Sequence, residues 1–189
     1  MTLSGMTPSR FGRPKKLGAP RTLALALTLA ITAIGLTACG GGDGGATSTD
    51  PAGLVSSATD SMSKQAWSDA LADLDRAIEG LGSDGDAALR TRAGVLRAEC
   101  LVRSNRGDEG RGALMSVAET ASWKDFKRVG EALADEDFLP EAIEVLDAGK
   151  KRFPDQEESF LAVIQDIQGR STLTDEAKEK LQSLGYMNK

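Results

Sequence analysis

Apolar residues recur every three or four positions in two stretches of the chain, residues 66–81 and 138–153. This spacing places them on one stripe of an α-helix, which indicates a helix with one face against a core. The stripe of the first stretch consists of Trp67, Ala70, Leu71, Leu74, Ile78 and Leu81. The second stripe consists of Leu139, Ala142, Ile143, Leu146 and Phe153. Corresponding positions are 72 residues apart, which indicates an internal repeat.

A displacement of 72 residues equals two periods of about 34–36 residues, so another helix pair is expected between the two stretches. Residues 87–100 and 107–119 supply that pair. Turn-forming residues break the pattern at 80–86, 104–110, 134–140 and 153–156. We therefore expect an all-α fold in which antiparallel helix pairs stack as a short α-α superhelix. An irregular helical bundle with the same periodicity is the alternative.

The C-terminal part has the pattern of a cap for such a stack. Residues 158–167 carry apolar side chains that can cover the open end of the last pair. Thr174 is the expected N-cap of a final helix, and Gly185 is expected in the left-handed conformation at its C-terminal end. Tyr186 would then fold back on Leu181. A stacked array needs such a capping helix because its last apolar face would otherwise meet water.

The third unit has the spacing of a known repeat at Phe126, Val129, Gly130, Leu133, Ala142, Leu146 and Pro154. This pattern resembles the tetratricopeptide repeat (TPR), with Phe for the leading Trp, Val for Leu and aliphatic residues for both aromatics. The first unit fits at Ala58, Trp67, Ala70, Leu74 and Ala77, and departs from the pattern at Ser61 and Gly82. In the second unit, Gly112 falls in the small-residue position and Ser116 in an aromatic one, which predicts light packing of its second helix.

The resemblance covers about residues 52–154, and it implies that the first helix of each pair lines an inner groove. Residues 86–106 carry a local charge of +3 in an otherwise acidic domain. We expect Arg97 and Lys127 at corresponding places in the groove, with Lys124 and Leu101 as further partner-binding residues. A cationic groove would suit an acidic or carboxylate-bearing peptide. Arginines that lie over the core and pair with neighbouring acids are the alternative.

The N-terminal segment has the pattern of an export signal. Five Lys and Arg residues and no acidic residue precede an apolar run of 14 residues, 23–36, which is too short to cross a bilayer comfortably. The following residues, Leu-Thr-Ala-Cys at 36–39, resemble the lipobox of bacterial lipoproteins. The resemblance implies cleavage before Cys39 and attachment of a diacylglyceryl group to its sulfur. An ordinary cleavage site beside an incidental cysteine and an uncleaved anchor are the alternatives.

These patterns divide the chain into four segments. Residues 1–38 are the expected lipoprotein signal peptide, and residues 39–52 are a lipidated Cys39 followed by a flexible Gly-rich tether. Residues 53–154 form the TPR-like helical repeats, and residues 155–189 form the C-terminal capping helices. The protein is expected to be exported and to hang by lipid from the cell membrane or the outer membrane.

The composition argues against several classes of function. Removal of residues 1–38 leaves a net charge of −10, which disfavours nucleic-acid binding. The chain has no histidine, the commonest general base and metal ligand, so we expect no enzyme activity, cofactor or metal site. Acidic clusters at 135–137 and 155–158 lie at helix boundaries, where acids favour the next N-terminus. Cys100 is expected to be a small buried residue.

Together these features predict a lipid-anchored scaffold that binds another envelope protein or a peptide and acts on no small-molecule substrate. A permanent helical accessory subunit of an envelope assembly, similar to a pilot protein, is the alternative. The two predictions differ in where the partner contacts lie.

Overall fold

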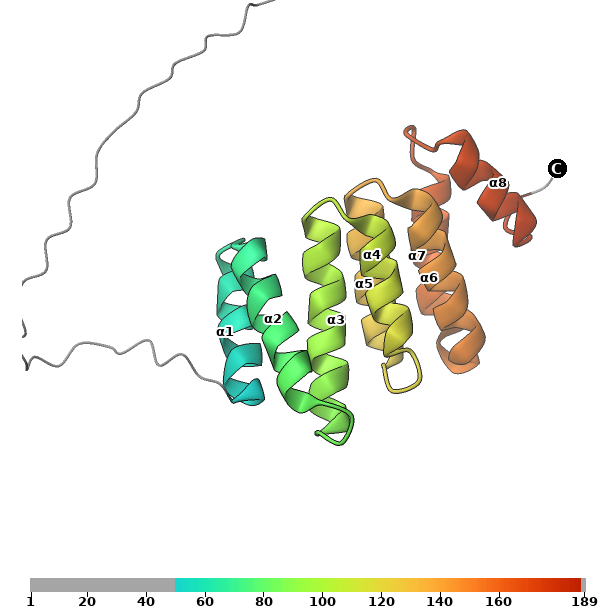
Figure 1. Ribbon diagram of the computed structural model, residues 1–189. Coiled ribbons are helices and arrows are strands. Elements are labelled where there is room, and N and C mark those ends of the chain that lie inside the picture. Colours follow the sequence, from blue (N-terminus) through green and yellow to red (C-terminus); the bar gives the residue numbers. More distant parts are fainter. Residues whose placement is uncertain (1–49, 188–189) are drawn as a thin grey trace, which may run out of the picture. The chain divides into compact units, whose positions relative to one another are not determined.

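The computed structural model describes residues 50–187 of the chain, all of which belong to the compact unit Gly44–Lys189. The predicted signal peptide, Cys39 and most of the tether lie outside the described residues. The described part is all-α, with eight α-helices, one short 3-10 helix and no strand (Figure 1). The helices are α1 (Pro51–Ser63), α2 (Trp67–Leu81), α3 (Ala87–Arg103), α4 (Gly107–Ser116), α5 (Trp123–Asp135), α6 (Leu139–Arg152), α7 (Glu157–Gln168) and α8 (Asp175–Ser183). The 3-10 helix is Pro154–Gln156.

Consecutive helices pack as pairs, and the pairs follow one another in sequence order across the domain (Figure 1). The helices α1, α3 and α5 begin at Pro51, Ala87 and Trp123, which are 36 residues apart. The bounds of α1 and α5 are displaced by 72 residues, as the apolar pattern predicted. The predicted all-α fold of stacked helix pairs is therefore confirmed. In residues 50–187, no helix is both long enough and apolar enough to cross a membrane.

The same turn joins the two helices of the first three pairs. Its middle residue is Gln65, Asn105 or Asp137, each in the left-handed conformation, with φ of 59°, 61° and 62°. The next residue donates its backbone N–H to the carbonyl five positions earlier, at 2.9 to 3.0 Å. This hydrogen bond is that of a Schellman cap, which satisfies carbonyls at the end of the first helix. The recurrence of one turn gives a register in which the three pairs can be compared.

Small residues occupy the same positions in all three pairs when they are counted from this turn. Ala70, Gly110 and Ala142 each follow the left-handed residue by five positions. A Cβ on Gly110 would lie 2.5 Å from Cγ2 of Val102 and 2.9 Å from the carbonyl oxygen of Ala98. The backbones of α3 and α4 therefore approach each other closely at Gly110.

The prediction that Gly112 fills the small-residue position is wrong. No atom lies within 4 Å of a Cβ built on Gly112, which faces open space. The aromatic position is occupied by Leu114, which is fully buried, and not by Ser116, which is exposed. The cause is that α3 has 17 residues against 13 in α1 and α5, which shifts the following turn within the repeat, and the alignment placed this turn two residues later than Asn105, where it lies. The second pair is consequently as well packed at this position as the others.

The two glycines of α4 give a matched test of this register. Gly110→Ala is expected to lower the free energy of unfolding by about 1–2 kcal/mol, because overpacking outweighs the better helix propensity of alanine. Gly112→Ala is expected to raise it by about 0.5–1 kcal/mol, since only the propensity changes. Urea unfolding followed by circular dichroism would measure both. Equal effects of the two substitutions would contradict the register.

The core continues from α1 to α8 in two adjoining clusters. The first contains buried residues of α1, α2 and α3, and the second contains those of α3 to α8. The last helix, α8, packs against α6 and buries Ala177 and Leu181. Thr174 caps it as predicted, and Gly185 is left-handed with φ 81°. The N–H of Tyr186 donates to the carbonyl of Leu181 at 2.8 Å, which confirms the predicted fold-back.

Candidate functional site

Two hollows lie along the side of the domain formed by the first helices of the pairs. We call this surface the odd-helix face and define it by the residues that line the two hollows. The first hollow, of about 300 Å³, is lined by Thr59, Ala88, Thr91, Arg92, Val95, Leu96, Asp125 and Arg128 of α1, α3 and α5. The second, of about 490 Å³, is lined by Lys127, Glu131, Ala134, Asp135, Ala162, Val163, Asp166 and Arg170 of α5, α7 and the residues after α7. This face is the strongest candidate for a binding surface.

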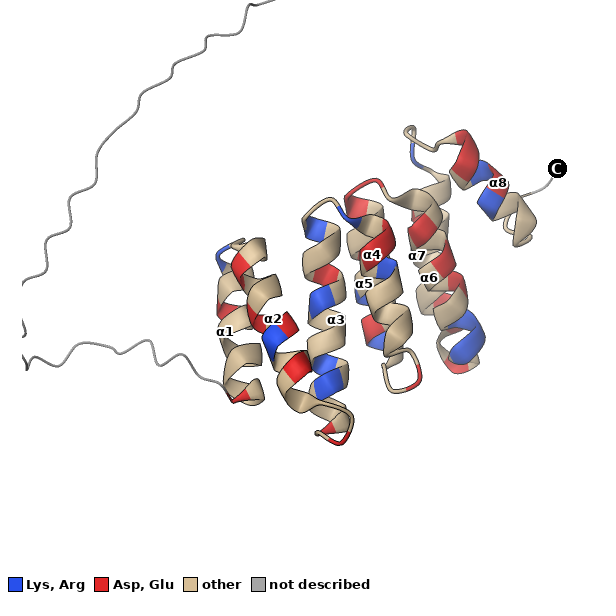
Figure 2. Cartoon of the chain, viewed as in Figure 1, with Lys and Arg blue, Asp and Glu red and all other residues tan. Residues whose placement is uncertain are grey.

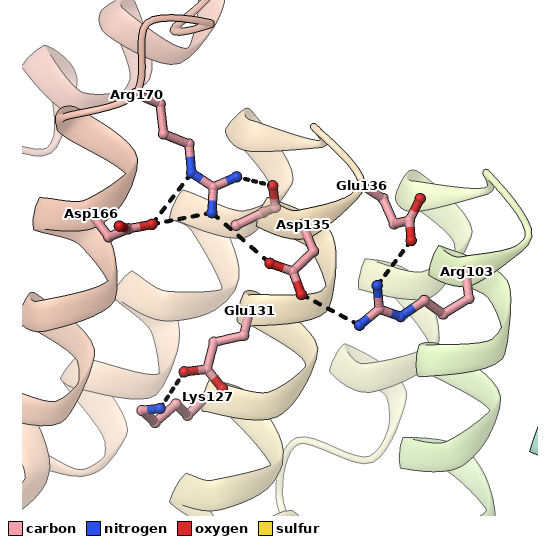
Figure 3. Close-up of polar contacts among 8 residues, drawn as sticks. Arg103, Lys127, Glu131, Asp135, Glu136, Asp166 and Arg170 are labelled. Carbon is pink, nitrogen blue, oxygen red and sulfur yellow. Dashed lines mark hydrogen bonds and ion pairs between the residues drawn. The ribbon is translucent and has the colours of Figure 1, made fainter. Parts of the chain in front are cut away.

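A chain of ion pairs crosses the odd-helix face from α3 to the residues after α7 (Figure 3). Arg103 contacts Glu136 at 2.9 Å and Asp135 at 3.4 Å. Arg170 contacts Asp166 at 3.1 Å and Asp135 at 4.0 Å, and it also donates a hydrogen bond to the carbonyl of Ala134. Asp135 therefore lies between two arginines that come from different helix pairs.

Two further cations of α5, Lys127 and Arg128, also have acidic partners. Lys127 pairs with Glu131 on the same helix, and Arg128 pairs with Glu99 of α3. The hollow between α5 and α7 thus has two cations and three carboxylates in its lining. Figure 2 shows basic residues along α3 and at the C-terminal end of α6, with acidic residues interspersed. The lining of this hollow is close to electrically balanced, in contrast to the expected cationic groove.

The four residues predicted for the partner-binding groove do not form one surface. Arg97 contacts Asp75 of α2 at 2.5 Å and lines a different hollow, between α2 and α4. Lys127 lies in the hollow between α5 and α7. Lys124 is exposed, with its ammonium 5.7 Å from the ring centroid of Trp123. Leu101 is 1% exposed and belongs to the core, so a partner on the surface cannot contact it.

The register of the turns explains why Arg97 and Lys127 are apart. Lys127 precedes the left-handed Asp137 by ten residues, and the residue ten before Asn105 is Val95. Arg97 corresponds instead to Val129 of α5. The expected equivalence of Arg97 and Lys127 is therefore wrong by two residues, or about 200° around a helix.

Sequence reasoning missed Asp135, Asp166 and Arg170 as residues of this face, and Arg103 at its edge. The sequence feature that could have identified them is a pair of opposite charges about one repeat apart. Arg103 precedes Asp135 and Glu136 by about one repeat, and Asp135 precedes Arg170 by the same interval. The hydrogen bond that Arg103 donates to Glu136 is the main cause of the raised pKa of Arg103, whose charge is therefore fixed.

The described residues offer neither a reactive cysteine nor a metal centre. Cys100 is fully buried, as predicted, and burial followed by the nearby Glu99 raises its pKa to about 12. The thiol consequently stays protonated near neutral pH and is not a ready nucleophile. Among residues 50–187, no group of three or more His, Cys, Asp and Glu side chains is placed to hold a metal ion.

Comparisons of the chain with protein-family models, with curated proteins and with solved structures find no match.

Proposed function

We propose that the protein is a TPR-like scaffold, attached to a membrane by lipid on Cys39, that binds a protein or peptide partner and performs no chemistry. Support for the TPR-like character comes from the shared turn at Gln65, Asn105 and Asp137 and the small residues that follow it. The membrane attachment rests on the signal-like residues 1–38 and the Leu-Thr-Ala-Cys sequence at 36–39. In this proposal the protein is exported and faces the cell envelope from the cell membrane or the outer membrane.

The observation that carries the proposal is the pair of hollows on the odd-helix face. Helices α1, α3, α5 and α7 each contribute side chains to it, so a bound segment can contact several pairs at once. The ion pairs of Arg103 and Arg170 hold polar groups in fixed places at its edge. Such preorganisation reduces the entropy that binding costs.

The balanced charge of the hollow between α5 and α7 favours a partner segment with both polar and apolar side chains. Ala162 and Val163 supply apolar surface, while Lys127 and Glu131 supply one charge of each sign. Nucleic acid is disfavoured as a partner because the chain after residue 38 carries a charge of −10. No cofactor or small-molecule substrate is part of the proposal.

A bulky residue in the hollow between α5 and α7 gives a direct test. Ala162 is exposed in the lining, so Ala162→Trp would fill the hollow without removing an ion pair. We expect this variant to lose crosslinking to its partner in intact cells while its circular dichroism and melting temperature stay unchanged. Ala72→Trp, at an exposed position of α2 outside the odd-helix face, is the matched control and should behave like the wild type.

A photo-crosslinking residue placed at Ala162 and, separately, at Ala72 would locate the partner. The proposal expects a crosslinked envelope protein from Ala162 only. Crosslinks from Ala72 alone would place the partner on the other side of the domain and favour a permanent accessory subunit.

A further inference from the structure

A third hollow, of about 310 Å³, opens between α2 and α4. Its floor comes from Arg90, Gly94 and Arg97 of α3. Its walls come from α2 and from the end of α4, with the residues Asp75, Ile78, Ala113, Ser116 and Val117. We call it the α2–α4 hollow. The α2–α4 hollow and the odd-helix face lie on different sides of α3. On the odd-helix face, the residues that α3 contributes include Thr91, Arg92 and Val95.

This hollow exists because the second helix pair departs from the regular repeat. α4 has 10 residues, whereas its counterparts α2 and α6 have 15 and 14. The last turn of α4 is therefore missing beside the C-terminal half of α2, where Asp75 and Ile78 lie. α4 and α6 pack against each other, while α2 and α4 form no comparable contact. The surface of α3 is left open between them.

The floor of the hollow is closed by close packing. A Cβ on Gly94 would lie 2.6 Å from Cγ1 of Val117, which shows how near the chain after α4 comes to α3. Ile78 and Val117 are half-buried, so apolar surface remains accessible in the walls. The hollow can therefore take an aliphatic side chain.

The lining of the α2–α4 hollow carries more cationic than anionic charge. Arg90 donates hydrogen bonds to the carbonyls of Gly82 and Gly85, and no carboxylate among residues 50–187 pairs with it. Arg97 donates a hydrogen bond from its Nε atom to Asp75, and in the described part of the chain its Nη atoms donate no hydrogen bond. The lining thus holds two guanidinium groups, of Arg90 and Arg97, and one carboxylate, of Asp75, whose side chain is 57% exposed. Free guanidinium N–H groups beside apolar walls are suited to a carboxylate.

We propose that the α2–α4 hollow binds a partner segment in which an acidic side chain stands next to an aliphatic one. The carboxylate bonds Arg90 and the Nη atoms of Arg97, and the aliphatic side chain contacts Ile78 and Val117. The charge of the lining is complementary to this occupant, since one added carboxylate neutralises it. The site goes beyond the proposed function, because it stands whether or not the odd-helix face binds anything.

The test uses the full-length mature protein in detergent and a fluorescent seven-residue peptide with alternating Leu and Glu. We expect fluorescence anisotropy to show binding that weakens as salt rises, because screening acts on exposed charges. The same peptide with Gln in place of Glu is expected to bind at least tenfold more weakly. Arg97→Gln is expected to weaken binding of the Glu peptide at least tenfold.

Two further variants separate the hollow from general charge effects. Ser116→Trp, at an exposed position of the lining, should block binding while both arginines remain. Arg92→Gln removes an arginine from the opposite side of α3 and is the matched control, which should bind like the wild type. Circular dichroism would verify that every variant is folded.

Three results would overturn the proposal. The first is that the Glu peptide does not bind at about 1 mM. The second is that Arg92→Gln and Arg97→Gln weaken peptide binding equally, and the third is that Ser116→Trp binds the peptide normally. Ala162→Trp, which fills the hollow between α5 and α7, should leave peptide binding unchanged. The outcome for this site is therefore distinguishable from the outcome for the odd-helix face.

Discussion

Gly130→Leu is expected to lower the free energy of unfolding by about 2–3 kcal/mol, at the upper part of the range for overpacked cores. A Cβ on Gly130 would lie 2.7 Å from Cδ2 and 2.8 Å from Cγ of Leu146. Leu146 is completely buried in α6 and cannot move aside without displacing its own neighbours. The remaining carbons of a leucine at this position would enlarge the clash.

Urea unfolding of residues 44–189 would measure this effect, since this fragment contains all eight described helices and both core clusters. Gly112→Leu is the matched control. It introduces the same side chain into a helix, but nothing lies within 4 Å of the site. An unchanged midpoint for Gly130→Leu would show that α5 and α6 are not in close contact there.

The helices could be predicted from sequence because their information is local. An apolar stripe of spacing three and four fixes which face of α2 and α6 is buried, and the turn-forming residues fix where they end. The cap of α8 followed from Thr174 and Gly185 for the same reason. These features require no knowledge of neighbouring helices.

The register of the second pair could not be predicted in this way. The decisive residue is Asn105, a left-handed residue that is not a glycine and ends a helix one turn longer than its counterparts. Without it, the alignment placed Gly112 where Gly110 belongs and Arg97 where Val95 belongs. Both errors are two residues in the same direction. A single misplaced turn therefore accounts for the wrong packing residue and the wrong groove residue.

The charge arrangement of the odd-helix face could not be predicted either, because it depends on contacts between different helices. Asp135 and Glu136 suggested only acids ahead of the next helix, yet they bind Arg103 of the preceding pair. Local net charge, such as the +3 of residues 86–106, does not show which carboxylates lie opposite. Most arginines of residues 86–106 form ion pairs with nearby acidic residues, as Arg97 does with Asp75 of α2.

Cys39→Ser is expected to abolish lipid attachment and to leave the precursor uncleaved. Serine lacks the sulfur nucleophile that receives the diacylglyceryl group in the lipoprotein pattern, while the proposed export signal, which includes residues 23–36, is unchanged. Mass spectrometry of the wild type should find a lipidated N-terminal Cys39, and the variant should retain residues 1–38. Two or more acyl chains give stable anchoring, so in the proposed function the change removes the lipid anchor.

Cys100→Ser is the matched control, since Cys39 and Cys100 are the two cysteines of the chain. Its site is buried in the core, so the substitution is expected to affect stability and not lipidation. A Cys39→Ser protein that is cut after Ala38 and released from the membrane would show cleavage by an ordinary signal peptidase. Leu36 makes that outcome unexpected, because it occupies a position where such an enzyme requires a small side chain.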